Sequence, residues 1–166
     1  MKSFSRSGYK IVNASLETKL IYSFFLIFTV VGFVTIGVYQ CRIIGWGLDA
    51  ITAYYRGDEA AMMFPKAFLQ LLEVSHAHAF IMGVIYLTLA HILIATRLGQ
   101  SWKLLLVTGG FLVTLLDLIS PWLIRYVDPT WAAVLLLSWL GMWVIYAAYV
   151  VIPLVDMWLI PPSTEE

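Results

Sequence analysis

Apolar residues fall in four long runs that charged residues separate. The runs cover residues 20–41, 67–96, 104–124 and 129–155, and only Glu73 and Asp117 bring charge into them. About 20 apolar residues cross the core of a bilayer as a helix. The runs are continuous rather than alternating, which argues against strands because an open sheet cannot satisfy its backbone in lipid. We therefore predict transmembrane helices over 20–41, 67–96, 103–124 and 130–158.

Composition leads to the same class of protein. Hydrophobic residues make up 61% of the 166-residue chain, charged residues only 12%, and the mean hydropathy is +0.88. A soluble domain is about one quarter charged. The predicted fold is an all-α integral membrane protein, a single domain of four helices bundled in the lipid bilayer. Ten basic residues balance ten acidic ones, so no polybasic surface is available to bind nucleic acid. The single cysteine, Cys41, excludes a disulfide framework and a cysteine-ligated metal site.

The distribution of lysine and arginine predicts the orientation. Six of them lie before the first run or between the second and third, and four lie on the other side. This bias places both termini in the cytoplasm, with the cytoplasmic membrane of a bacterium as the expected location. The connection 42–64 is expected at the outer interface, either as a short helix or as a loop anchored by aromatic residues. Pro65, Ser101 and Asp128 are expected to start the second, third and fourth helices.

Every histidine of the chain lies on the second predicted helix. At about 100° per residue, Glu73 and His91 project in one direction and His76 lies about 60° away, whereas His78 points to the far side. His76 and His91 are separated by a rise of about 22 Å, which places them near opposite faces of the bilayer core. Gly83 projects within about 20° of His76 and leaves room for a flat ring system or another helix.

Two histidines stacked on one face of a helix, with a glycine between them, resemble the haem-bearing helices of cytochrome b-type membrane subunits. The resemblance covers residues 67–96. It implies that His76 and His91 each ligate one b-type haem, with Gly83 against the macrocycle, and that electrons pass across the membrane between the two haems. Cytochromes b carry a second histidine pair on another helix, and this chain has none. The remaining axial ligands would have to come from a methionine, another membrane subunit or a second copy of the chain.

A second group of polar residues gives other possibilities. Asp117 is expected at a depth similar to that of Glu73 and His76, because its helix runs in the opposite direction. Glu73, His76 and His78 offer carboxylate and imidazole ligands to copper or another metal. Alternatively, Asp117 and Glu73 can take protons from a quinol. A third possibility is that these polar groups only hold helices together.

The sequence therefore predicts a membrane subunit of a redox complex, which ligates or packs b-type haem and passes electrons between quinone and a partner subunit. The alternatives are a copper or other metal-binding membrane subunit centred on Glu73, His76 and His78, and a purely structural subunit. An electron-transfer role fits the residues better than catalysis within this chain. The expected partners are other membrane subunits or a second copy of the chain.

Overall fold

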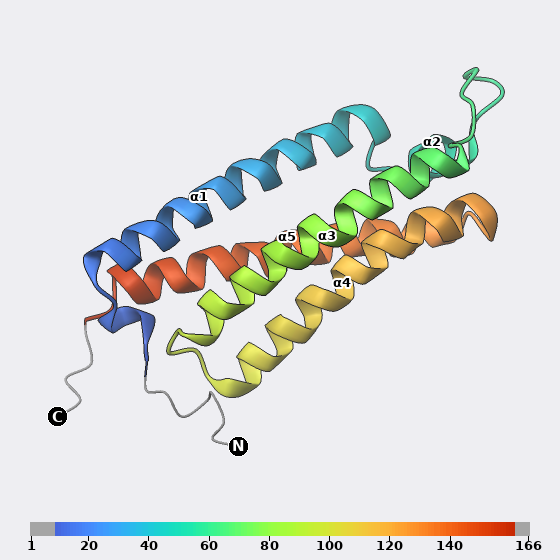
Figure 1. The fold of residues 1–166 in the computed structure, drawn as a ribbon. Coiled ribbons are helices and arrows are strands. Elements are labelled where there is room, and N and C mark those ends of the chain that lie inside the picture. The colour runs from blue at the N-terminus through green and yellow to red at the C-terminus, as the bar shows by residue number, and fades with distance from the viewer. Residues whose placement is uncertain (1–8, 162–166) are drawn as a thin grey trace.

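Four long helices run lengthwise past one another in the computed structural model, which describes residues 9–161 (Figure 1). Each is long and apolar enough to cross a membrane, which confirms the predicted fold class. The helices are α1 (Leu16–Tyr39), α3 (Phe68–Ile94), α4 (Gln100–Tyr126) and α5 (Trp131–Trp158). A π-helical turn, Gln40–Ile44, continues α1.

The helix starts differ from the expected ones in three places. Pro65 lies before α3 rather than in its first turn, because the N-cap is Ala67, whose backbone N–H donates to the Gln70 side chain at 3.1 Å. The N-cap of α4 is Gly99, so Ser101 already lies inside the helix. Asp128 lies in the turn before α5, whose N-cap is Thr130. Pro65, Ser101 and Asp128 therefore lie within about three residues of a helix start, but none of them is the N-cap.

The connection between α1 and α3 contains a short helix, α2 (Leu48–Arg56). Ile51 and Tyr55 on this helix are buried against α4 and α5, so its apolar face is covered by the bundle. Gly57 ends α2 in a left-handed conformation with φ +86°, where a Cβ atom would lie 2.7 Å from the Met63 carbonyl oxygen. Only glycine fits there without strain. α2 is thus fixed as a cover over one end of the bundle.

Side chains tie the elements together at the opposite end. The Lys103 ammonium group donates to the carbonyl oxygens of Ile94 at 2.8 Å and Thr96 at 2.6 Å. The buried Asp156 carboxylate accepts from the Arg97 backbone N–H at 3.1 Å. The short segment before α1 joins here as well, through a hydrogen bond from the Ile11 N–H to the Ala95 carbonyl. Asp156 therefore acts as a packing residue at the α3–α4 connection.

α1 lies along the outside of a bundle formed by α3, α4 and α5 (Figure 1). It packs on α5 through Phe33, whose ring stacks on Tyr146 with centroids 4.0 Å apart and meets Trp143 edge-on. Gly37 lies against the Trp143 ring with no room for a Cβ atom. Most other apolar side chains of α1 are exposed. Open space therefore remains between α1 and the bundle.

Candidate functional site

The structure places His76, Gly83 and His91 on the outer surface of α3. All three are exposed, and no atom outside α3 lies within 4 Å of the position of a Cβ atom at Gly83. The predicted shared face therefore exists, and it points away from the bundle. The His91 Nδ1 atom lies 2.7 Å from the Leu87 carbonyl oxygen of its own helix, and the His76 ring contacts Phe80 edge-on. Neither imidazole belongs to a group of three His, Cys, Asp or Glu side chains that could hold a metal ion within residues 9–161.

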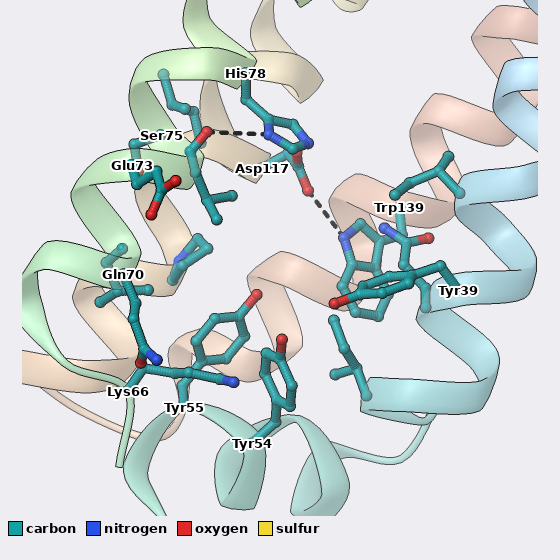
Figure 2. Close-up of a pocket in the computed structure, with 17 residues that line it drawn as sticks. Tyr39, Tyr54, Tyr55, Lys66, Gln70, Glu73, Ser75, His78, Asp117 and Trp139 are labelled. Atoms are coloured by element: carbon teal, nitrogen blue, oxygen red, sulfur yellow. Dashed lines mark hydrogen bonds between the residues drawn. The ribbon is translucent and has the colours of Figure 1, made fainter.

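His78, on the opposite side of α3, is the histidine that faces the interior. Its Nδ1 atom lies 3.1 Å from the Val74 carbonyl oxygen (Figure 2). A carbonyl oxygen can only accept, so Nδ1 donates in this contact, and in the neutral imidazole the acceptor is then Nε2. His78 therefore presents a hydrogen-bond acceptor to the cavities that it lines.

Asp117 on α4 lies between His78 and Trp139 (Figure 2). The Trp139 indole N–H, from α5, donates to Asp117 Oδ1 at 2.9 Å. Pro121 follows one turn later, and because proline has no N–H it cannot make the usual helical hydrogen bond to the Asp117 carbonyl. The tryptophan fixes one oxygen of the carboxylate and leaves the other available for a ligand. Asp117 is thus held in place at mid-helix by a donor from a neighbouring helix.

A cavity of about 310 Å³ opens beside this pair, between α1 and α3 and beneath α2. Its volume is at the lower end of the range for small-molecule sites, about 300–1,000 Å³. Many of the side chains that line it carry a hydrogen-bonding group, namely Tyr39, Gln40, Tyr54, Tyr55, Lys66, Gln70, Glu73, Ser75, His78, Asp117 and Trp139. The Lys66 ammonium group lies 3.9 Å from the centre of the Tyr54 ring. We call this space the polar cavity.

A second cavity, of about 290 Å³, continues along α1 towards the middle of the bundle. It shares His78, Asp117 and Trp139, together with Ile36 and Gln40, with the polar cavity. The rest of its wall is mostly aromatic and aliphatic: Phe28, Thr29, Gly32, Phe33, Met82, Ile85, Met142, Trp143 and Tyr146. We call it the apolar cavity. The hydrogen-bonding groups of His78 and Asp117 thus stand where a polar and an apolar space meet.

The predicted site residues are therefore divided between two places. Glu73, His78 and Asp117 line the polar cavity, whereas His76 and His91 lie outside. Glu73, His76 and His78 do not converge, and no group of three His, Cys, Asp or Glu side chains in residues 9–161 is arranged to hold a metal ion. The site combines one imidazole and two carboxylates with aromatic donors.

Several residues of the site were missed by the sequence reasoning, Trp139 and Tyr55 among them. Tryptophans in a membrane protein are first expected at the lipid interface, and Trp139 is mid-helix. A carboxylate inside a membrane span, such as that of Asp117, needs a hydrogen-bond donor. That requirement was the signal in the sequence that could have pointed to Trp139. Burial of Tyr55, and secondarily the Asp117 charge, raise the pKa of its hydroxyl group. Tyr55 therefore stays protonated at the wall of the polar cavity.

A family model described as a transmembrane helical domain matches residues 45–164. The chain belongs to this family. The match covers α2 to α5, and with them His78, Asp117 and Trp139, but not α1. Neither a curated protein nor a solved structure matches the chain.

Proposed function

We propose that this protein is a membrane subunit of a redox complex and that it binds a quinol or quinone in the polar cavity. One observation carries the proposal: His78 and Asp117, from different helices, present an acceptor nitrogen and a carboxylate at the inner end of a ligand-sized cavity. A quinol ring has hydroxyl groups that such acceptors bind, and a flat face that suits aromatic walls. Trp139, Tyr54 and Tyr55 supply such walls.

The residues suit the proton chemistry of quinol oxidation. A quinol that becomes a quinone releases two protons and two electrons. His78 Nε2 and the free oxygen of Asp117 are suited to accept a proton from a ring hydroxyl, and Trp139 keeps Asp117 in position. The electrons would leave to a one-electron carrier in a partner subunit. In the opposite direction the same groups would return protons to a quinone.

Proton exchange with water would take place on the α2 side of the bundle. The polar cavity is lined there by Lys66, Gln70 and Glu73, and Glu73 is exposed. The other end of the bundle is closed by the hydrogen bonds of Lys103 and Asp156. Glu73 is therefore the residue best placed to pass protons between the cavity and the α2 side.

Titration of a short-chain benzoquinone into the purified chain in lipid nanodiscs, followed by quenching of tryptophan fluorescence, tests the proposal. Removing one partner of a buried hydrogen bond costs about 1–3 kcal/mol, so Asp117→Asn and His78→Phe are each expected to weaken binding by about five- to 150-fold. Asp49→Asn, an exposed carboxylate of α2 outside the cavity, is the matched control and keeps wild-type affinity. Equal affinity of the Asp117 and His78 variants and the wild type would rule the site out.

The outward histidines support a second proposal, a b-type haem shared with a partner. The contact of His91 Nδ1 with the Leu87 carbonyl leaves Nε2 as the free nitrogen, and exposure of His76, Gly83 and His91 leaves this face of α3 accessible to another chain. One imidazole per haem would come from this chain and the other ligand from the partner subunit or a second copy.

The haem proposal is tested on the complex purified from native membranes. His76→Ala and His91→Ala are each expected to remove a different component of the reduced-minus-oxidised optical spectrum. His78→Ala, which faces the cavities, should leave both components in place. A complex without haem, or spectra that neither outward histidine affects, would refute this proposal and leave the quinone site untouched.

A further inference from the structure

The apolar cavity adjoins the proposed ring site, and the side chains that line it indicate the chemistry of the rest of the ligand. We infer that the ligand carries a long hydrocarbon tail and that this tail lies in the apolar cavity, in the groove between α1 and α3 with α5 as its floor. The inference rests on the proposed function, because it assigns the ring to His78 and Asp117. It adds the class of ligand, a tailed lipid quinone, and the route by which it enters.

The position of the polar pair supports this assignment. His78, Asp117 and Trp139 line both cavities, so a ring oxygen bound to them lies at their junction. In lipid quinones the tail is attached to the ring carbon next to an oxygen-bearing carbon. A ring in the polar cavity with its oxygen on His78 or Asp117 therefore directs its tail into the apolar cavity. The polar cavity and the apolar cavity therefore adjoin each other in the same way as the ring and the tail of a lipid quinone.

The walls of the apolar cavity suit a flexible chain. They consist of aromatic rings and the adaptable side chains of Met82 and Met142. Gly32 of α1 faces this space with no atom near the position of a Cβ atom. The side chains with polar groups at this end are Thr29, whose hydroxyl donates to the Phe25 carbonyl at 2.9 Å, Tyr146 and Trp143. No charged side chain lines the cavity beyond Asp117. A hydrocarbon chain thus displaces no polar contact of α1.

The groove is open along the membrane rather than towards water. Phe28, Gly32 and Ile36 of α1 line the apolar cavity and are exposed. All three lie within an apolar helix long enough to span a membrane. A ligand dissolved in the bilayer can therefore enter sideways between α1 and α3, with its tail remaining in an apolar environment throughout.

Two neighbouring substitutions on α1 provide the test. Gly32→Phe fills the groove from a position with free space, whereas Val31→Phe adds similar bulk to a side chain that is 57% exposed and lines neither cavity. Binding of a tail-less benzoquinone and of its decyl-tailed analogue is measured in the same nanodiscs at equal mole fraction in the lipid. This design cancels the general partitioning of the tail into the bilayer.

We expect Gly32→Phe to weaken binding of the tailed quinone at least about tenfold, the usual cost of forcing bulk into an occupied space. Binding of the tail-less quinone should remain unchanged, and Val31→Phe should affect neither ligand. If Gly32→Phe affects both quinones equally, or neither, the tail does not lie in the groove, even though the ring site stands. Failure of both quinones to bind the wild type refutes the ring site itself, so the two failures are distinct.

Cross-linking locates the tail directly. A decyl quinone with a photoreactive diazirine at the tail end is expected to label peptides from residues 28–36 of α1 and from Met82 or Ile85 of α3. Labelling confined to the outer face of α4 would place the tail in bulk lipid and overturn the assignment.

Discussion

Tyr86 has the one buried side-chain polar atom without a hydrogen-bond partner among the described residues. Its hydroxyl lies in the core between α3, α4 and α5, where the ring contacts Tyr146 and Tyr149. An unsatisfied buried hydroxyl costs about 1–3 kcal/mol. We therefore expect Tyr86→Phe to leave the free energy of unfolding unchanged or raise it by about 1 kcal/mol.

Tyr149→Phe is the matched control for that measurement. The Tyr149 hydroxyl donates to the Leu106 carbonyl at 3.3 Å, so its removal should lower the free energy of unfolding by about 1 kcal/mol. Both changes in the free energy of unfolding are to be measured by reversible unfolding in mixed detergent micelles. A larger loss in Tyr86→Phe than in Tyr149→Phe would mean that the Tyr86 hydroxyl has a partner, such as a bound water.

Asp128, in the turn between α4 and α5, gives the protein a stability that depends on pH. Hydrogen bonds from the Thr130 hydroxyl at 2.6 Å and the Thr130 backbone N–H at 2.8 Å lower the pKa of this carboxyl group. A lowered pKa in the folded state stabilises the fold above the unfolded value, about 3.9, and this contribution disappears as the pH falls through the folded value.

The midpoint of thermal unfolding, measured in detergent between pH 6 and pH 2.5, tests this contribution. Relative to Asp128→Asn, the wild type should lose stability below about pH 4. Thr130→Ala, which lacks the hydroxyl donor, should show a smaller loss that begins at the same pH and is complete at a higher pH. Parallel curves for all three proteins would show that this turn does not contribute.

The three histidines show what residue spacing can predict about a helix and what it cannot. The helical period correctly separated His76 and His91 from His78, because 100° per residue is a property of any α-helix. It did not identify the inward face. α3 is apolar around most of its circumference, so its sequence has no polar side to mark the exterior. The inward face was decided by Trp139 and Asp117 on neighbouring helices, and no pattern within residues 67–96 contains that information.

At the scale of helices, the close approach of α1 to α5 depends on Gly37. A Cβ atom there would collide with the Trp143 ring, which Phe33 also contacts. Gly37→Ala is expected to lower the free energy of unfolding by about 1–3 kcal/mol, the usual cost of overpacking, despite the better helix propensity of alanine.

Gly32→Ala, one turn earlier in α1, has the same propensity gain and meets no atom. It should be neutral or stabilising by up to about 1 kcal/mol. Unfolding in detergent separates the two variants, and equal stability would show that α1 does not depend on this contact.

The existence and type of the long helices followed from the sequence. A charged side chain costs free energy in lipid, and a continuous apolar run of this length is typical of a membrane-spanning helix. The helix ends did not follow, and the sequence left open whether the connection 42–64 contains a short helix or is a loop. Ser101 has the chemistry of a cap, but the extended backbone of Gly99 starts α4 two residues earlier. α2 is helical because Ile51 and Tyr55 have a surface of α4 and α5 to pack on, which is a tertiary cause.

At the scale of the whole molecule, both ends of the described chain lie at the α3–α4 end of the bundle. Ile11 is hydrogen-bonded to Ala95, and the Arg97 side chain donates to the Pro161 carbonyl. The charge bias predicts that this end faces the cytoplasm and that α2 faces the outside.

Labelling with a membrane-impermeant maleimide checks this orientation. In a Cys41→Ser background, Glu59→Cys lies exposed after α2 and should react in intact cells, whereas Gln100→Cys, exposed at the start of α4, should react only after lysis. The reverse pattern would invert the topology.

The α1 wall of the groove and most of the proposed ring site come from different elements. The residues of the proposed ring site that come from α3, α4 and α5 lie within residues 45–164. The part of the groove wall that α1 contributes, from Phe28 to Ile36, lies before them in the chain. The tail and the ring of the proposed ligand would therefore contact largely different parts of the chain, chiefly α1 for the tail and chiefly α3 to α5 for the ring. Chimaeras that replace residues 20–35 of α1 with another apolar helix sequence, and keep Ile36, Tyr39 and Gln40 of the polar cavity, are therefore expected to change tail-length preference without changing the preference for the ring.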